Sequence, residues 1–151
     1  MQTRSIPALL ALLGLFLAPV AGSLAGDMPP ADALPLSTIL KKLEQGHSGK
    51  IAEAEFDDGY WEVKVCKSDA CQKLYIQPRS GVEKRRRHTH YEETPPPGAM
   101  KLSSIVYGLE AHRLGTITEI EFDDGVWEVE LRRSGRKIKL YIDPMTGESR
   151  R

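Results

Sequence analysis

The sequence predicts an α+β fold of two tandem α-β-β-β repeats, each a short helix packed on a three-stranded antiparallel sheet. The first observation is an internal repeat: from Leu36 the chain reads LSTILKKLEQGHSGKIAEAEFDDGYWEV, and from Leu102 it reads LSSIVYGLEAHRLGTITEIEFDDGVWEV. About half of the aligned pairs are identical, so each copy is expected to form one supersecondary unit. The second observation is a change from helical to alternating hydrophobic spacing within each copy. The third is a DDG turn between two apolar runs.

The N-terminus of the chain has the features of a secretory signal peptide. A basic start precedes an almost wholly apolar run over residues 6–20, and Ser23 and Ala25 are small residues suited to cleavage after Ala25. The apolar run is too short to span a bilayer comfortably, which disfavours the alternative of an uncleaved anchor. We therefore expect a signal peptide over residues 1–25 and a flexible segment over residues 26–34. The mature protein is expected to be periplasmic or secreted, without stable membrane insertion.

Each repeat is expected to open with an amphipathic helix. Four apolar residues recur at helical spacing in each copy and form one stripe. They are Leu36, Ile39, Leu40 and Leu43 in the first copy, and Leu102, Ile105, Val106 and Leu109 in the second. Ser37 and Ser103 are the candidate N-caps of these helices. The stripe predicts that each helix packs by one face on the strands that follow it.

Two strands joined by a tight turn are expected after each helix. In the first of them, apolar residues alternate with glutamates, which is typical of a half-buried strand. These apolar residues are Ala52, Ala54 and Phe56 in one copy, and Thr118, Ile120 and Phe122 in the other. The DDG sequences at residues 57–59 and 123–125 are typical of hairpin turns. Trp61 and Trp127 then start the second strand as the aromatic anchors of two equivalent cores.

A third strand is predicted from the pairing that brings apolar residues opposite one another. With Ser134 and Gly135 as the loop, the pairs are Leu131 with Ile138, Val129 with Leu140 and Trp127 with Ile142. The same register in the first copy places Cys66 opposite Cys71, in a non-hydrogen-bonded pair where Cβ atoms approach most closely. Because exported proteins retain disulfides, we predict a cross-hairpin disulfide. The alternatives are a redox-active pair or half of a metal site, which the spacing does not favour.

The two repeats are predicted over residues 35–87 and 100–151, with a proline-rich linker over residues 88–99. The three consecutive prolines, residues 95–97, favour a stiff, extended connection. A module of some fifty residues buries only about 60% of its unfolded surface, so the two repeats are expected to pack together. The sequence leaves their relative orientation open.

The combined pattern resembles the PepSY domain family over nearly all of the mature chain. The closing motif of that family is similar to DPMTGE at residues 143–148, and its first two strands are similar to GTITEIEFDDGVWEVEL at residues 115–131. The first copy departs from the closing motif, with Gln77 in place of the aspartate and with Arg79 and Ser80 inside the turn. The resemblance implies an exported bacterial protein. Members occur in propeptides of secreted metallopeptidases, and the family's proposed role is to inhibit or regulate proteases.

Composition and motifs exclude several functional classes. The chain balances 21 basic against 21 acidic residues, which argues against strong attraction to nucleic acid or to an anionic membrane. The paired aspartates of the DDG turns are better explained as turn formers than as an acid–base pair. The sequence has no Ser, His and acid set, zinc motif or phosphate-binding glycine loop, so we expect a non-enzymatic protein without a cofactor.

The candidate partner surface is the face of the sheet opposite the helices. Tyr60, Tyr75, Tyr141 and Glu128 are its predicted contact residues, because tyrosine amid charges is typical of protein interfaces. Solvated cross-strand pairs are the alternative interpretation of the same residues. Exposed strand edges offer a further route, since an extended peptide can add a strand to a sheet. The predicted partner is therefore a protein or peptide, and the resemblance implies a peptidase.

Two further features carry alternative interpretations. His88 and His90 would point to one side of an extended segment and could bind copper or zinc, although the polar linker offers no clear third ligand. The alternative function is accordingly a periplasmic metal or small-ligand sensor centred on these histidines. The basic run at residues 84–87 could contact phosphates or an acidic partner, and solvated surface is its ordinary interpretation.

Overall fold

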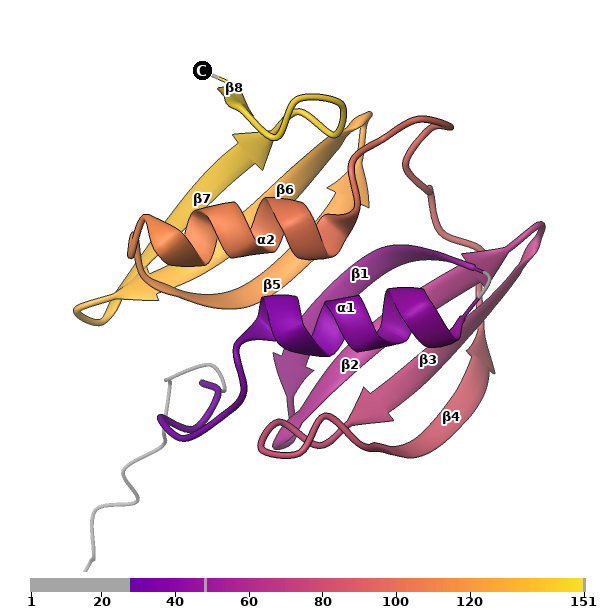
Figure 1. Cartoon of the computed structure of the whole chain (residues 1–151), viewed down its shortest axis with the longest axis horizontal. Coiled ribbons are helices and arrows are strands. Elements are labelled where there is room, and N and C mark those ends of the chain that lie inside the picture. The colour runs from indigo at the N-terminus through magenta and orange to yellow at the C-terminus, as the bar shows by residue number, and fades with distance from the viewer. Residues whose placement is uncertain (1–27, 48, 151) are drawn as a thin grey trace, which may run out of the picture.

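A computed structural model describes residues 28–47 and 49–150 of the chain (Figure 1). Its elements are α1 (Leu36–Gly46), β1 (Lys50–Asp57), β2 (Tyr60–Lys67), β3 (Ala70–Ile76), β4 (Glu83–Thr89), α2 (Leu102–Ala111), β5 (Thr116–Asp123), β6 (Val126–Arg133), β7 (Arg136–Ile142) and β8 (Ser149–Arg150). This mixture of helices and antiparallel sheet confirms the predicted α+β class. The predicted signal peptide, residues 1–25, lies outside the described residues.

Each repeat has one strand more than the three that the sequence predicts. β4 pairs antiparallel with β3, and the two-residue β8 pairs antiparallel with β7. β4 reads EKRRRHT, which has no apolar alternation to indicate a strand. Its pairing with β3 is a tertiary contact that local sequence does not reveal. β4 also continues through Thr89, so His88 lies in the sheet and not in the linker.

All eight strands form a single antiparallel sheet in the order β4-β3-β2-β1-β5-β6-β7-β8. The two repeats therefore meet where β1 pairs with β5. Glu53 lies opposite Glu121, Glu55 opposite Glu119, and Ala54 opposite Ile120 in this pairing. Residues at equivalent places in the two copies exchange partners, which is the pattern that a twofold relation between the repeats produces.

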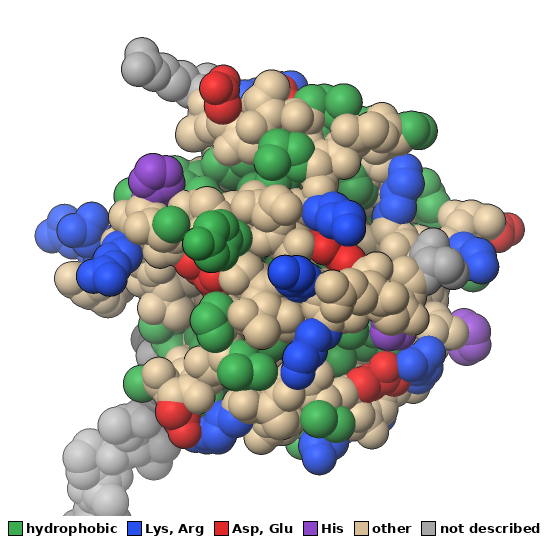
Figure 2. Space-filling view, in the orientation of Figure 1, with side chains coloured by type: hydrophobic (Ala, Val, Ile, Leu, Met, Phe, Trp, Pro, Cys, Tyr) green, Lys and Arg blue, Asp and Glu red, His purple; other side chains and the backbone are tan. Residues whose placement is uncertain are grey.

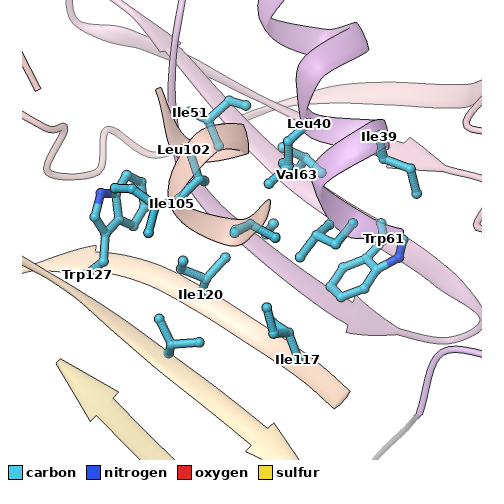
Figure 3. Packing of buried hydrophobic residues seen from close by; sticks show 14 of the residues in the cluster. Ile39, Leu40, Ile51, Trp61, Val63, Leu102, Ile105, Ile117, Ile120 and Trp127 are labelled. Carbon is cyan, nitrogen blue, oxygen red and sulfur yellow. The ribbon is translucent and has the colours of Figure 1, made fainter. Parts of the chain in front are cut away.

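Both helices cover the same face of the sheet (Figure 1). Their apolar stripes are buried there against β1–β3 and β5–β7, and the buried residues of both repeats form one continuous hydrophobic core. Figure 3 shows Trp61 near Ile39 and Trp127 near Ile105, at equivalent places in the two copies. The shared core accounts for the stability of two units that are each too small to bury enough apolar surface alone.

Each tryptophan packs in the same way in its own repeat. The side chains of Trp61 and Trp127 are 2% and 0% exposed. Trp61 makes an edge contact with Phe56, with ring centroids 5.4 Å apart, and Trp127 makes one with Phe122 at 5.2 Å. Edge contacts of this kind add to the hydrophobic stabilisation from burial. The predicted equivalence of the two aromatic anchors is therefore confirmed.

Carboxylates exchanged between the helices satisfy the helix N-termini. The predicted N-caps are wrong by two positions, because Pro35 and Lys101 occupy the cap positions and Ser37 and Ser103 lie within the first turn. The two helices exchange these contacts reciprocally. Ser37 donates from its N–H and hydroxyl to Glu110 at 3.4 and 2.5 Å, and Ser103 donates in the same way to Glu44 at 3.0 and 2.5 Å. A carboxylate is favoured beside the free N–H groups of a helix start. We call these two contacts the helix latch.

The hairpins have the predicted register. The observed pairs are Leu131 with Ile138, Val129 with Leu140, Trp127 with Ile142, Val63 with Leu74 and Trp61 with Ile76. Cys66 and Cys71 are opposite each other and form the predicted disulfide, with their Cα atoms 4.0 Å apart. Arg132 and Lys137 lie opposite each other at the same place in the second repeat. The fold of one repeat therefore does not require the bridge.

Replacing both cysteines, as Cys66→Ala/Cys71→Ala, is expected to lower the free energy of unfolding by about 2 kcal/mol, because the disulfide closes a short loop in the unfolded chain. Urea titration of the oxidised protein and of the variant measures the difference. Reducing agent should destabilise the wild type to the same extent and leave the variant unchanged. Two reactive thiols per chain in the native, unreduced protein would contradict this prediction.

The connecting segments are bonded to the sheet. In the linker, the Lys50 ammonium donates to the carbonyl oxygen of Pro95 at 2.6 Å, and Glu93 accepts a hydrogen bond from the Asp124 N–H at 3.1 Å. Residues 28–34, expected to be flexible, contact the turn after β3. There, the Leu34 N–H donates to the Pro78 carbonyl at 2.9 Å. The linker is therefore bonded to both repeats, and the segment before α1 is bonded to the first repeat.

Candidate partner-binding face

One face of the sheet carries no helix, and we call it the open face. Strand register places on it the following side chains: Glu53, Glu55, Tyr60, Glu62, Lys64, Lys73, Tyr75, Arg85 and Arg87 from the first repeat, and Glu119, Glu121, Glu128, Glu130, Lys137, Lys139 and Tyr141 from the second. Figure 2 shows the other, helix-covered face, over which Lys and Arg side chains are scattered. On the open face, in contrast, the charged side chains follow the strands in rows.

A stripe of glutamates runs along the middle of the open face. It consists of Glu53 and Glu55 from β1 and Glu119 and Glu121 from β5, which pair across the junction of the repeats. The regular alternation that starts at the DDG turns puts these glutamates outward, and it is interrupted only before Glu53 and Glu119, by a bulge after Ile51 and another after Ile117. The predicted alternation is therefore wrong at Ala52. This residue packs with the disulfide and not in the main core.

The stripe is acidic beyond what the surrounding lysines neutralise. Burial is the main cause that raises the pKa of Glu55, of Glu119 and of Glu121 above the ordinary glutamate value, and neighbouring carboxylates raise each further. None of these three is ion-paired among the described residues. Glu53, in contrast, forms an ion pair with Lys64. The face therefore offers three half-buried carboxylates to a cationic group.

Lysines border the stripe and are bound to carboxylates of their own repeat. Lys73 forms an ion pair with Glu62, and Lys139 forms the equivalent pair with Glu128 at 2.5 Å. Lys137 binds Glu130 at 2.5 Å. Lys64 also binds Glu92 of the linker at 2.8 Å, and this pairing could not be inferred from the sequence because the two residues belong to segments with no predicted contact.

The predicted contact residues differ in exposure. Tyr141 is 42% exposed at the side of β7, whereas Tyr75 is only 3% exposed although it occupies the equivalent place on β3. The Arg85 guanidinium lies 3.8 Å from the centroid of the Tyr75 ring and covers it. Tyr75 is therefore corrected to a buried residue, because β4 extends over it. Tyr60 and Glu128 are partly exposed on the open face and remain predicted contacts.

Replacing Glu119 with glutamine is expected to stabilise the protein at neutral pH by about 0.2–1 kcal/mol, the range for cross-strand charge pairs. The raised pKa means that the folded state binds more protons than the unfolded state just above the ordinary glutamate pKa, so the free energy of unfolding decreases as pH rises through that window. Urea titrations at pH 7 and below pH 4 should show a stabilisation present only at the higher pH. Glu128→Gln, which breaks the Lys139 ion pair, is the control and should not stabilise.

His88 and His90 have no third metal ligand beside them among the described residues. His88 is exposed in β4, and His90 is exposed just after it. Within residues 28–47 and 49–150, no group of three His, Cys, Asp or Glu side chains is placed to hold a metal ion. The arrangement of these histidines therefore does not favour the metal-sensor alternative.

Several hollows of the described residues lie away from the open face, and two of them lie over the helices or under the linker. A groove of about 560 Å³ lies over the two helices and is lined mainly by polar residues, among them Lys41, Ser104 and the exposed Tyr107. A second hollow of about 260 Å³ lies under the linker prolines and reaches Trp127. Neither brings together a nucleophile, a base and an oxyanion donor in the described part of the chain.

The comparison with protein-family models agrees with the repeated architecture. The model of the family described as peptidase propeptide and YPEB domain matches two regions of the chain, residues 7–83 and 89–150. A search of curated proteins found no match. A crystal structure of a candidate lipoprotein from Clostridium difficile is similar at 9% sequence identity, with a TM-score of 0.47, over 79% of this chain and 91% of that one. No helix in the described residues is long and apolar enough to cross a membrane. The two family matches together span most of the sequence, and the chain belongs to the peptidase propeptide and YPEB domain family, the PepSY family.

Proposed function

We propose that this chain is an exported, non-enzymatic protein that binds a protein or peptide partner through the open face and thereby regulates a peptidase. The observation that carries the proposal is the central stripe, in which Glu55, Glu119 and Glu121 lie half-buried and form no ion pair with any described residue. Removing carboxylates from water without a partner destabilises the free protein. A partner that supplies lysine or arginine side chains to the stripe would offset that cost.

Family membership supports the peptidase part of the proposal, because the family is described by its occurrence in peptidase propeptides. A propeptide domain acts by contacting the enzyme that it accompanies. Tyr60, Tyr141 and Glu128 border the stripe and supply the mixed aromatic and charged rim that is typical of protein interfaces. Export is supported by the predicted cleavage after Ala25, which N-terminal sequencing of the mature protein tests directly.

The test combines affinity capture with mapping of the surface. Immobilised wild-type protein is used to capture partners from an envelope extract, and a captured partner is then purified and titrated against variants. Glu119→Lys and Tyr141→Ala should each weaken binding at least about fivefold, the change that corresponds to the loss of one good contact. Tyr107→Ala, which removes an aromatic side chain 69% exposed on the helix-covered face, is the matched control and should bind as the wild type does.

Two results would overturn the proposal. One is repeated capture without any specific partner, and the other is a purified partner whose affinity depends on Tyr107 but not on Glu119 or Tyr141. If the purified partner is a peptidase, its rate on a peptide substrate in the presence of the wild type and of Glu119→Lys shows whether binding at the open face also regulates activity. Unchanged rates with saturating wild type would limit the function to binding.

A further inference from the structure

The outer edge of β4 is an open strand edge with an unusual concentration of positive charge. β4 is the terminal strand of the sheet, so among the described residues only β3 pairs with it. Lys84, Arg85, Arg86 and Arg87 are consecutive and exposed along this edge. An open edge presents unpaired N–H and C=O groups, to which an extended peptide can add a strand.

The fold of a repeat does not require this basic strand. The second repeat provides an internal comparison, because its corresponding strand, β8, has only two residues and covers only the end of β7. The tryptophan of the second repeat is nevertheless as well buried as that of the first, with Trp127 0% and Trp61 2% exposed, although Leu140 and Tyr141 on β7 are more exposed than Leu74 and Tyr75 on β3. β4 therefore covers part of β3, but the burial of a repeat's tryptophan does not depend on its run of four cations.

The charges of β4 point to both faces of the sheet. Arg85 and Arg87 lie opposite Tyr75 and Lys73 and so belong to the open face, whereas Arg86 lies opposite Leu74 and belongs to the helix side. Lys84 is the residue that the register skips between Tyr75 and Ile76. Within the described residues, Arg86 alone of these four is ion-paired, through Glu83 at 2.5 Å. Arg85 and Arg87 therefore present cations without carboxylate partners among the described residues on the open face, and Arg86 presents a cation of the same edge on the helix side.

The backbone alternation of β4 leaves defined groups free for an added strand. Cys66 and Cys71 form a non-hydrogen-bonded pair of β2 and β3, because they follow the pair that closes a two-residue turn. Cys71 therefore bonds to β4, where its partner is Thr89. Counting along the strand from Thr89, Arg86 and His88 direct their N–H and C=O groups to the free edge. These two residues would bond to an incoming strand.

We propose that the edge of β4 accepts an acidic, extended segment of a partner protein as a ninth strand of the sheet. The inference rests on the proposed function, since it names a partner class for a protein that binds proteins. Consecutive side chains of an added strand point to opposite faces, so a run of Asp or Glu residues places carboxylates beside Arg85 and Arg87 on one face and beside Arg86 on the other.

The geometry favours a peptide over the other anionic partners. A membrane surface is planar and would engage the cations of only one face at a time, and phosphates of a nucleic acid have no use for the free N–H and C=O groups of Arg86 and His88. A second copy of the same strand would set Lys84 to Arg87 against their own like charges, which disfavours self-pairing.

The test uses a short synthetic peptide with a run of glutamates between threonine and valine residues, labelled for fluorescence anisotropy. It should bind the wild type, and both charge variants, Lys84→Gln/Arg86→Gln and Arg85→Gln/Arg87→Gln, should weaken binding at least about fivefold. Arg86→Pro removes an N–H that faces the free edge and should abolish binding while the β3 pairing remains. A second readout needs no variant: the peptide methylated at alternate backbone amides should lose binding to the wild type.

The outcomes separate this inference from the proposed function. Equal binding of the methylated peptide, or binding of phosphatidylglycerol vesicles without binding of the peptide, would overturn the strand addition. If a captured partner binds Arg86→Pro normally but loses affinity for Tyr141→Ala, the inference fails and the open-face proposal stands. If the partner loses affinity for Arg86→Pro, and a segment of it replaces the synthetic peptide in competition, strand addition at β4 is supported.

Discussion

Replacing Trp127 with alanine is expected to lower the free energy of unfolding by about 3–5 kcal/mol, the range measured when a large buried aromatic residue is truncated. The side chain is 0% exposed and contacts Phe122 edge-on, so the variant loses both hydrophobic burial and an aromatic contact and leaves a cavity. Chemical denaturation followed by circular dichroism measures the change. A loss of this size is a large fraction of the total stability of about 5–15 kcal/mol that is typical of single domains.

Trp61→Ala should have a similar effect, and the whole protein should still unfold in one transition. Both tryptophans belong to one continuous core, so weakening either repeat weakens the common unit. Tyr107→Ala, at a residue 69% exposed, is the control and should change stability by no more than about 0.5 kcal/mol. Two separate unfolding transitions, with only one of them shifted by Trp127→Ala, would contradict the shared core.

Much of the fold could be predicted because its signals are local. The apolar stripes locate both helices, and the DDG turns fix hairpins in which Asp58 and Asp124 each have φ of 47°, a region that aspartate tolerates in turns. Once a turn is placed, the side-chain period of two sets the register, and the pairing of Cys66 with Cys71 follows from it. Because the two repeats are similar in sequence, the register predicted for one hairpin applies to the other.

The features that sequence reasoning missed depend on contacts between distant segments. The pairing of β1 with β5 joins two polar-faced strands, and neither strand records which partner it meets. The bulges after Ile51 and Ile117 add one residue to a regular alternation, and only the completed ladder shows where. β4 is polar at every position, so its role as a strand depends on the edge that β3 offers.

The candidate site was predicted in outline but not in its electrostatics. Alternating glutamates were expected to face solvent, and in separate repeats they would be ordinary solvated side chains. Joining β1 to β5 brings Glu55 beside Glu119 and partly removes both from water, which raises the pKa of each. The acidic stripe is therefore a property of the assembled pair of repeats. Tyr75 shows a further effect of tertiary contacts. β4 buries Tyr75, whereas the equivalent Tyr141 in the second repeat stays exposed.

The helix latch is the second contact on which the union of the repeats depends. Replacing both carboxylates, as Glu44→Ala/Glu110→Ala, is expected to lower the free energy of unfolding by about 2–4 kcal/mol, since each glutamate makes charge-assisted hydrogen bonds worth about 1–2 kcal/mol net. Each single variant also leaves the N–H and hydroxyl of Ser37 or Ser103 without the carboxylate that satisfies them. Urea titration of both single variants and of the double variant gives the values.

Reciprocity makes this prediction sharper than a loss of stability alone. Because the two contacts are equivalent in geometry and lie at opposite ends of an antiparallel helix pair, Glu44→Ala and Glu110→Ala should cost similar amounts. Gln45→Ala, an exposed neighbour of Glu44 on α1, is the matched control and should leave stability unchanged within about 0.5 kcal/mol. Ser103→Ala should lower the free energy of unfolding by less than Glu44→Ala does, because the backbone N–H of residue 103 still donates to the Glu44 carboxylate. A double variant as stable as the wild type would show that the β1–β5 pairing and the shared core suffice to hold the repeats together.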